Sequence, residues 1–413
     1  MRIAIVGSGI SGLVAAHLLQ PRHEICVYES ERRIGGHTHT VDVEIDGERC
    51  AVDTGFIVYN ERTYPHFTRL LAKLGVETQP SDMSFGLTCE RTGLEWSSRG
   101  LRGLFAQPSN ALRPAFHRML RDVLRFNREA RRLLDLESEK VSLGDYLCGA
   151  GYSREFVEHY ALPMGAAIWS ADPGSFLRVP AATFVRFFDN HGLLEARPSL
   201  PWRVVRGGSA RYADALVAPF RQRIRLGCPV RSIRRNDAAV EVVSAEGVRS
   251  FDHVILAVHS DQALRLLEDP SALERRLLGS IAYQENDVVL HTDVSLMPRR
   301  RSAWASWNYR GPRDSGGRVV VSYDMNRLQG IESRHRFLVT LNAAERIAPE
   351  RVLGRFVYHH PVLDAEAITA QKLHGEISGI GRTHYCGAYW GYGFHEDGVK
   401  SALAVCERFG VGL

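Results

Sequence analysis

The chain has 413 residues, of which 45% are hydrophobic and 24% are charged, and its formal net charge is +5. A hydrophobic share of this size allows at least one large buried core, and the length predicts two or three domains. This composition excludes a disordered tail or linker, and the small positive charge requires no nucleic-acid partner.

The seven cysteines are scattered along the chain, and no two of them form a CxxC pair. This usage is typical of a reducing cytoplasm and indicates neither a disulfide framework nor a zinc site. Outside the glycine-containing N-terminal segment, no apolar run is long enough to span a bilayer. We therefore expect a cytoplasmic protein without a metal.

The N-terminal segment, RIAIVGSGISGLVAAHLL, predicts a buried strand over 3–6, a turn, and a helix from about Ser11. Gly7, Gly9 and Gly12 form G-x-G-x-x-G, in which the first glycine permits the turn, the second lets a pyrophosphate approach and the third lets helix and strand pack closely. The helix N-terminus would offer N–H donors to phosphate. A second strand, HEICVYES, brings Glu29 to the place of a ribose-binding carboxylate, about twenty residues past the glycines.

The run that follows, ESERRIGGHT, resembles the E-x-x-x-R-x-G-G-R-T signature of FAD enzymes in the flavin amine oxidase superfamily, which includes monoamine and polyamine oxidases, protoporphyrinogen oxidase and carotenoid desaturases. Arg33 can neutralise pyrophosphate, whereas His37 replaces the last arginine of the signature. The segment AVDTGFIVYN resembles the D-x-G-G segment, with Gly55 retained and Phe56 in place of the second glycine. The resemblance implies FAD rather than NAD, bound non-covalently.

Further pieces of the same cofactor domain are expected downstream, at 202–220, 224–244 and in the strand FDHVILAVHS. Val230 matches the family position that contacts adenine through its backbone. Near the end, CGAYWGYGFHEDGVKSA predicts a strand, a glycine loop and a helix that begins near Asp397, whose dipole would stabilise charge on a reduced flavin. The residues expected to bind the cofactor are Gly7, Gly9, Ser11, Gly12, Glu29, Ser30, Arg33, Gly35, Gly36, His37, Gly55, Phe56, Ile57, Val230, Gly387, Phe394, Asp397, Gly398 and Val399.

Candidate catalytic residues lie in the same C-terminal stretch. His395 and Glu396 are predicted proton acceptors, and His395 is attractive because an unperturbed imidazole titrates near neutrality. Asp397 is either a helix cap or a further acceptor. Tyr389, Trp390, Phe394 and Trp307 could line a substrate pocket, although aromatic residues in such places often simply pack.

The remaining chain forms the second predicted domain. Residues 60–195 read as helical, and 280–375 contain alternating strands typical of an antiparallel sheet. We predict an α/β fold: a Rossmann-type FAD-binding domain from 1–60, 200–280 and 376–413, and an α+β substrate domain from 61–199 and 281–375, built on an antiparallel sheet. The segment 112–136 predicts a basic amphipathic helix, which either contacts an anionic membrane peripherally or packs as an outer helix of its own domain.

Three functions remain open from the sequence. Blocks such as VDTGFIVYNERTYPHF resemble a bacterial branch of amine-oxidase-like FAD proteins related to the N-terminal domain of plant cyclopropane fatty-acid synthases. That resemblance implies an FAD-dependent dehydrogenase or desaturase of a hydrophobic substrate, such as a phospholipid acyl chain, with hydride transfer from a substrate C–H to flavin N5. The alternatives are an amine oxidase that forms imine and hydrogen peroxide, and a non-catalytic flavin-binding accessory protein of a lipid methyltransferase. No second glycine fingerprint for a nicotinamide is visible, so oxygen, a quinone or another acceptor would reoxidise the flavin.

Overall fold

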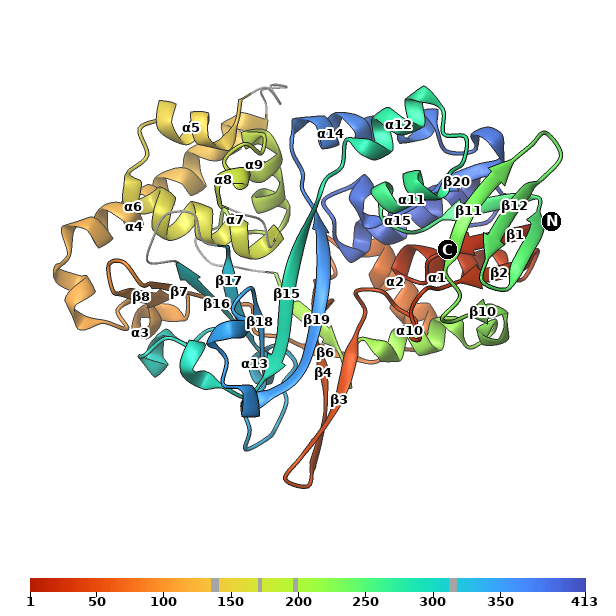
Figure 1. Ribbon diagram of the computed structural model, residues 1–413. Coiled ribbons are helices and arrows are strands. Elements are labelled where there is room, and N and C mark those ends of the chain that lie inside the picture. The colour runs from red at the N-terminus through yellow and green to blue at the C-terminus, as the bar shows by residue number, and fades with distance from the viewer. Residues whose placement is uncertain (135–140, 170–172, 196–199, 312–317) are drawn as a thin grey trace.

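The computed structural model describes residues 1–134, 141–169, 173–195, 200–311 and 318–413. Its first sheet is parallel and has five strands, drawn from distant parts of the chain: in order, β10 (Ile224–Arg225), β2 (Glu24–Tyr28), β1 (Arg2–Val6), β14 (His253–Leu256) and β20 (Thr383–Tyr385). Both termini lie beside this sheet, at the right of Figure 1. The predicted discontinuous Rossmann-type fold is confirmed.

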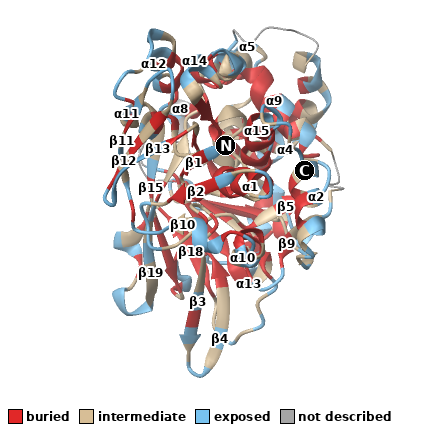
Figure 2. Cartoon of the chain, turned by 90° about the vertical axis from the view of Figure 1, so that its right-hand side faces the viewer, coloured by how far each residue is buried: buried red, intermediate tan, exposed pale blue. Residues whose placement is uncertain are grey.

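Side chains alternate between the two faces of this sheet, as the two-residue period of a strand requires. Ile3 and Ile5 pack into one core, whereas Ala4 and Val6 pack into another. The helices of the first core are α1 (Ile10–Leu19), α2 (Pro65–Leu74), α10 (Ala210–Val217) and α15 (His395–Glu407). The second core is closed by β11 (Val230–Arg235), β12 (Val240–Ser244), β13 (Gly247–Phe251), α11 (Ser260–Leu266), α12 (Ala272–Gly279) and α14 (Ala365–Lys372). Figure 2 shows the buried strands and α1 in red.

The second sheet has seven strands and belongs to the other domain. Their order is β19 (Val352–Pro361), β15 (Tyr283–His291), β18 (Leu338–Leu341), β17 (Val320–Asp324), β16 (Trp307–Gly311), β7 (Phe85–Cys89) and β8 (Leu94–Ser97). All neighbours are antiparallel except β7 and β16, which are parallel. The antiparallel sheet predicted for 280–375 is therefore present. The prediction that 60–195 is helical holds for α2 to α9 but missed β7 and β8, which extend this sheet.

Helices cover this sheet at the left of Figure 1. They are α3 (Gly100–Leu104), α4 (Pro114–Glu129), α5 (Leu143–Gly149), α6 (Arg154–Phe156), α7 (Leu162–Trp169), α8 (Pro173–Phe176) and α9 (Ala181–Asn190). Fully buried phenylalanines join several of them into one core: Phe126, Phe156, Phe184 and Phe188. The last two residues of the predicted helix 112–136 lie outside the described residues, and α4 ends at Glu129.

Three segments cross the predicted domain boundaries. Helix α2 contributes Phe67, Leu70 and Leu71 to the core of the parallel sheet, although its residues were assigned to the substrate domain. Helix α14 likewise packs on α12. The hairpin of β3 (Thr40–Ile45) and β4 (Glu48–Asp53) instead contributes Val43 and Val52 to the core of the seven-stranded sheet. The sequence indicated the helix that begins near Pro65 but neither α14 nor the β3–β4 hairpin, and it carried no information about which sheet each of them covers.

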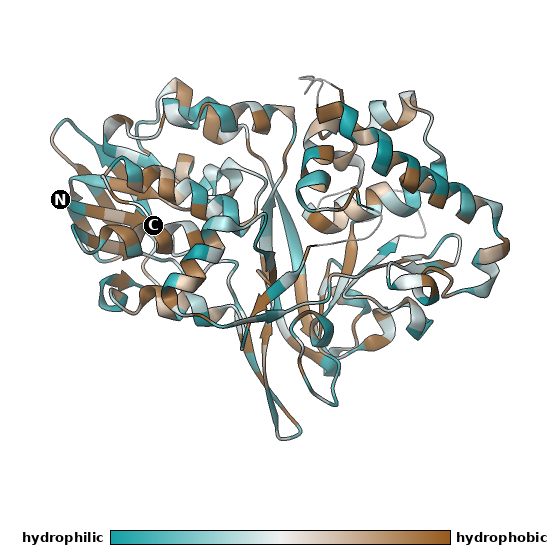
Figure 3. Cartoon of the chain, turned by 180° about the vertical axis from the view of Figure 1, so that it is seen from behind, coloured by the Kyte–Doolittle hydropathy of each residue, from teal (hydrophilic) through white to brown (hydrophobic). Residues whose placement is uncertain are grey.

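The hydropathy of the chain follows this layering, with brown, apolar segments inside both sheets and teal, hydrophilic stretches on the outer helices in Figure 3. Among the residues that the structure describes, none of the helices has the length and apolar content needed to traverse a lipid bilayer.

Candidate active site

A cavity of about 1230 Å³ extends from the glycine-rich turn after β1 to helices α4 and α7 of the other domain. One end is lined by loops at the carboxyl ends of β1, β2 and β14, where open α/β sheets bind their ligands. The other end is lined by apolar side chains from the seven-stranded sheet and its covering helices.

The glycine-rich turn gives the first end its shape. Gly7 has φ +101°, and a Cβ there would lie 2.6 Å from the carbonyl oxygen of Ala257. A Cβ on Gly9 would meet nothing within 4 Å, so this backbone borders open space in the cavity. A Cβ on Gly12 would lie 2.0 Å from the Gly7 oxygen, which confirms that this glycine allows the helix to pack on the turn rather than facing the cavity.

Glu29 directly follows β2, and its carboxylate is fixed beside the turn. One oxygen accepts hydrogen bonds from the backbone N–H (2.9 Å) and hydroxyl (2.6 Å) of Ser8. The other accepts from Glu31 N–H at 2.9 Å and the Ser30 hydroxyl at 3.2 Å. Glu29 and Ser30 both line the cavity. These four hydrogen bonds use the about four lone-pair sites of a carboxylate, so a ligand hydroxyl would replace the Ser30 hydroxyl, which makes the longest of the four bonds.

Arg33 lines the same end of the cavity as a positive charge. Its guanidinium donates to the Gly36 carbonyl at 2.7 Å and contacts the Glu31 carboxylate at 3.3 Å. Gly35 pairs with Gly9 across an isolated β-bridge. The two glycine turns are therefore joined, and the arginine is held at their edge.

His37, in place of the signature arginine, is part of a cluster of imidazoles on the cavity wall. Its ring lies 5.4 Å from that of His360 and 6.2 Å from that of His259. Burial, together with these neighbouring rings, lowers the pKa of His37 well below its usual value. Burial lowers the pKa of both His259 and His360 to about 4. These imidazoles are therefore neutral at pH 7, and His37 Nε2 is buried without a hydrogen-bond partner in the described structure.

The C-terminal glycine loop forms another wall through Gly387, Tyr389, Gly393, Phe394 and His395. Helix α15 begins at His395, two residues before the predicted start. Asp397 accepts a hydrogen bond from Phe394 N–H at 3.1 Å, so it closes the first helical turn, and burial raises its pKa to about 6.

Asp397, Gly398 and Val399, predicted to bind the cofactor, do not line the cavity. Val399 is fully buried in the core. The Gly398 carbonyl accepts a hydrogen bond from Ser11 Oγ at 3.0 Å, and a Cβ on Gly398 would lie 2.8 Å from Ile10 Cγ2. These residues therefore pack α15 against α1, while Phe394 and His395 present the helix N-terminus to the cavity.

The two predicted proton acceptors, His395 and Glu396, both make hydrogen bonds within the protein. His395 Nε2 lies 3.0 Å from Thr38 Oγ1 and 2.9 Å from the Tyr212 hydroxyl, and its ring stacks on Phe56 at 3.6 Å. Burial lowers the pKa of His395 to about 3, so it is a poor base at neutral pH. Glu396 does not line the cavity, and it accepts hydrogen bonds from His66 N–H (3.1 Å) and Phe67 N–H (3.0 Å) at the start of α2. The structure contradicts the assignment of Glu396 to the reaction.

The other predicted contacts meet at the cavity from separate segments. Ser11, Gly55, Phe56, Ile57 and Val230 all line it. Ser8 lines it as well, and sequence reasoning missed it because its role depends on the hydrogen bonds to Glu29.

Three aromatic side chains lie next to one another across the seven-stranded sheet and line the far end of the cavity. In the strand register, Trp307 is opposite Tyr323 on one side and Phe85 on the other. The predicted pocket residue Trp307 is therefore on the wall. Trp390 is not on the wall, because its ring stacks on His374 at 4.3 Å behind the loop.

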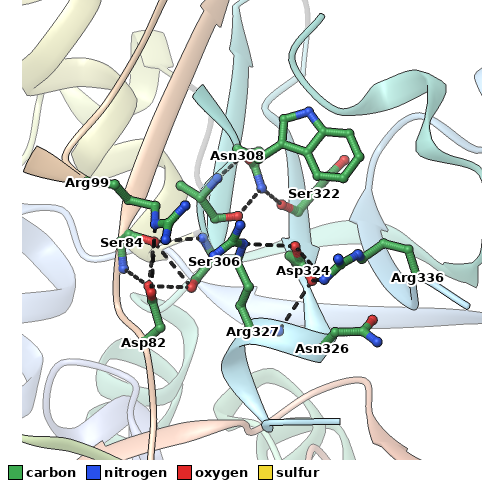
Figure 4. Close-up of polar contacts among 12 residues, drawn as sticks. Asp82, Ser84, Arg99, Ser306, Asn308, Ser322, Asp324, Asn326, Arg327 and Arg336 are labelled. Atoms are coloured by element: carbon green, nitrogen blue, oxygen red, sulfur yellow. Dashed lines mark hydrogen bonds and ion pairs between the residues drawn. The ribbon is translucent and has the colours of Figure 1, made fainter. Parts of the chain in front are cut away.

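Polar contacts beside these aromatics hold their strands together (Figure 4). The Asp82 carboxylate accepts hydrogen bonds from Ser84 N–H at 2.8 Å and Ser306 Oγ at 2.7 Å. The Ser306 carbonyl in turn accepts from Asp324 N–H at 2.8 Å, and Asp324 pairs with Arg336 at 3.1 Å. This network fixes the loops preceding β7 and β16 and the end of β17, and with them the neighbouring aromatics.

Helix α4 contributes its apolar face to the cavity through Met119, Leu120, Val123 and Leu124. That face therefore has an internal partner, as predicted by the outer-helix alternative. Among the described residues, no group of three or more His, Cys, Asp or Glu side chains could hold a metal ion. His359 and His360 both line the cavity, but they form no such group.

The sequence profile of the flavin containing amine oxidoreductase family matches residues 10–340. The chain belongs to this family. A protein of Mycobacterium tuberculosis named as a flavin-containing monoamine oxidase, AofH, is 29% identical over 280 residues, which cover 65% of this chain and 59% of that protein. The carotenoid phi-ring synthase of Streptomyces griseus is 26% identical over 293 residues, covering 64% of this chain and 53% of the synthase. The aligned region thus spans little more than half the length of these relatives.

Solved structures of the same fold cover the whole chain. Putrescine oxidase bound to putrescine superposes with a TM-score of 0.71 at 16% identity, covering 99% of each chain. A fatty acid isomerase from P. acnes superposes with a TM-score of 0.68 at 17% identity, covering 99% of this chain and 98% of the isomerase. Membership of this family implies that the cofactor is FAD.

The residues at the first end of the cavity fit FAD. The open space at Gly9 and the α1 N-terminus suit a pyrophosphate, the Glu29 carboxylate suits a ribose hydroxyl, and Arg33 supplies a cation. The neutral His37 does not supply the second charge that the family arginine would bring. The protein would therefore hold the diphosphate of FAD with backbone donors and Arg33.

Proposed function

We propose that this enzyme is a dehydrogenase that introduces a double bond into a hydrophobic chain, such as a fatty-acyl chain of a phospholipid. The observation that carries the proposal is the composition of the cavity beyond the cofactor end. Its wall there consists mainly of apolar and aromatic side chains, among them Met83, Phe85, Met119, Leu120, Met164 and Trp307, with a few polar ones such as Ser84 and Asn127. Such a wall favours burial of methylene groups, each worth about 0.8 kcal/mol.

FAD, when bound, supplies the acceptor for a hydride taken from a substrate C–H bond. The protein binds and orients the chain between the sheet aromatics and α4, and the same walls exclude water from the reacting carbon. Each dehydrogenation also releases one proton. Burial lowers the pKa of the cavity-lining His37, His259 and His360 as well as that of His395, so none of these imidazoles keeps the proton at neutral pH and it passes to solvent.

The fold accommodates such a substrate class, since one structure that superposes on the whole chain is a fatty acid isomerase. Peripheral contact with a membrane, in keeping with a place at the inner face of the cytoplasmic membrane, would let the enzyme take up acyl chains. The basic residues on the outer side of α4 support this part of the proposal.

An amine oxidase is the second candidate, favoured by the similarity to AofH and by aromatic rings around Phe394. Phe394 lies 5.3 Å from Phe187 and 6.3 Å from Trp169, measured between ring centroids, and all three line the cavity. Such a group of rings can desolvate a neutral amine. The apolar side chains beyond the cofactor end, however, favour a longer hydrophobic chain over a small amine.

The deciding experiment is anaerobic reduction of the purified flavoprotein, which is monitored as the loss of the flavin's visible absorbance. We expect bleaching by phospholipids with unsaturated or methyl-branched acyl chains, with a new double bond in the product detected by mass spectrometry. Bleaching by amines alone, with peroxide released on admission of oxygen, would establish the amine oxidase. No bleaching by either class would favour an accessory protein that carries flavin for a lipid methyltransferase.

A further inference from the structure

A second depression, of about 510 Å³, lies on the outer side of helix α4. We name it the arginine groove; it is lined by Arg118, Arg121, Asp122, Leu124, Arg125, Arg128, Gly151 and Ser153. Helix α4 lies at the outer left edge of the molecule in Figure 1, far from the parallel sheet. No residue of the groove belongs to the cofactor end of the cavity.

The groove and the large cavity meet at Leu124, which lines both. Its side chain is 63% exposed, which is unusual for a leucine on a cavity wall. The cavity is also lined by residues within one helical turn of Leu124, namely Leu120, Val123 and Asn127. The Asn127 side-chain oxygen is buried there without a hydrogen-bond partner in the described structure. Helix α4 therefore separates an apolar chamber from a basic surface, with Leu124 at the boundary.

Positive charge in the groove exceeds its negative charge. The groove has four guanidinium groups and three neighbouring carboxylates. Arg118 pairs with Glu155 at 2.5 Å, and Glu129 pairs with both Arg125 (2.9 Å) and Arg128 (3.0 Å). The third carboxylate, Asp122, accepts a hydrogen bond from Ser153 N–H at 2.9 Å. Arg121 is exposed and has no hydrogen-bond or ion-pair partner among the described residues. A bound anion with one negative charge would therefore neutralise the groove.

We propose that the arginine groove binds the anionic head, a carboxylate or a phosphate, of an acyl-chain amphiphile whose tail enters the cavity past Leu124. This inference rests on the proposed function, because it assumes that an acyl chain occupies the chamber. Guanidinium groups match both anions, which accept two parallel hydrogen bonds from them. The head fixes how far the chain enters, so the groove selects which carbon reaches the cofactor end.

The test measures binding of three twelve-carbon probes to the FAD-loaded protein by calorimetry, below their micellar concentrations. Laurate carries a carboxylate, dodecyl phosphate carries a phosphate, and dodecanol is uncharged. We expect the anionic probes to bind more tightly than dodecanol, and 0.5 M NaCl to remove much of that preference. The relative affinity of laurate and dodecyl phosphate distinguishes a free fatty acid from a phosphorylated lipid head, and either preference supports the groove.

The double substitution Arg121→Gln/Arg128→Gln should weaken binding of the preferred anionic probe about fivefold and leave dodecanol unchanged within twofold. The double substitution Arg121→Lys/Arg128→Lys keeps both charges and should retain most of the affinity for that probe. Arg132→Gln removes the same charge from an exposed position outside the groove and serves as the control. Leu124→Glu should weaken binding of all three probes, because it places a charge where the tail passes.

Equal binding of laurate, dodecyl phosphate and dodecanol would overturn the inference that the groove binds an anionic head. Equal affinities of the double variant and the Arg132→Gln control would do the same, and both outcomes leave the proposed function intact. An unchanged affinity for every probe in the Leu124→Glu variant would place the tail elsewhere and also overturn the inference. If no twelve-carbon probe binds the wild-type protein, the proposed acyl substrate fails, and the inference fails with it.

Discussion

Both carboxylate oxygens of Glu29 accept hydrogen bonds from the loops around the glycine-rich turn, so this side chain is fixed before any ligand arrives. We expect Glu29→Gln to weaken FAD binding by about tenfold, because an amide has one acceptor oxygen and a hydrogen bond to a charged acceptor contributes roughly 1.5–3 kcal/mol. Quenching of FAD fluorescence on titration of the apoprotein measures the dissociation constant.

Glu24→Gln is the matched control for that substitution. Glu24 begins the same strand and is exposed at its other end, so its loss should leave FAD affinity unchanged. An equal dissociation constant for the two variants would show that Glu29 makes no contact with the cofactor.

His395 was predicted to accept a proton, and its surroundings lead to the opposite expectation. Because burial lowers its pKa to about 3, His395 stays neutral across the range in which the enzyme would work. We expect His395→Gln to retain the rate of anaerobic flavin reduction within about threefold between pH 5 and 9, and to lose about 1–3 kcal/mol of stability through its buried hydrogen bonds. A limb of the pH–rate profile that disappears in this variant would restore His395 to the reaction.

At the scale of elements, Glu396 joins two helices that are far apart in sequence. It lies in the first turn of α15 and accepts the first free N–H groups of α2, whose N-terminus has no side-chain cap of its own. Glu396→Gln should therefore lower the free energy of unfolding by about 1–2 kcal/mol.

Chemical denaturation with excess FAD measures this loss, and FAD affinity should change little because Glu396 does not line the cavity. Glu407→Gln, at the exposed end of the same helix, controls for the loss of a charge. Unchanged stability together with lost flavin reduction would contradict the capping role and return Glu396 to the site.

The contrast between Glu29 and Glu396 also shows what the sequence could reveal. Gly7, Gly9 and Glu29 act within one β-α-β unit, so their spacing along the chain predicts their proximity in space. The partners of Glu396 lie 329 and 330 residues away, at a helix start that has no local signature. Nothing in the segment 112–136 could show that one face of α4 lines a cavity, because the opposite wall comes from strands around Phe85 and Trp307.

Periodicity likewise identified the strands of 280–375 but not β7 and β8, which are short apolar runs between helices. Their place in the sheet depends on pairing of β7 with β16, more than 200 residues later. The parallel direction of that pair follows from tertiary structure alone. Long-range pairing of this kind, rather than local propensity, decides the shape of the substrate end.

At the scale of the whole molecule, buried imidazoles determine how stability depends on pH. Burial lowers the pKa of seven histidines to about 3 or 4: His39, His191, His259, His291, His360, His384 and His395. Between pH 6.5 and about 4, the unfolded chain binds protons at these positions and the folded protein does not, so stability falls as pH falls. Asp53 and Asp397 act in the opposite direction, because burial raises their pKa to about 6 and the folded state binds protons there first.

His291 isolates this effect from cofactor binding, because it does not line the cavity. Its Nδ1 accepts a hydrogen bond from Asp293 N–H at 3.1 Å, so the proton is on Nε2, which donates to Thr340 Oγ1 at 2.7 Å. A protonated ring would lose the first bond at a fully buried position. His291→Asn should therefore reduce the pH dependence of the unfolding free energy by up to one proton, or about 1.4 kcal/mol per pH unit, between pH 4.5 and 6.

Urea denaturation of the FAD-loaded protein at several pH values measures this slope for the wild type and the variant. Any release of FAD at acid pH affects both proteins equally, so it cancels in the difference between the two slopes. His117→Asn removes an exposed imidazole from α4 and controls for the substitution itself. Parallel slopes for His291→Asn and the wild type would mean that His291 is protonated to the same extent in the folded and unfolded chains, and the acid sensitivity would then have to come from the other buried histidines.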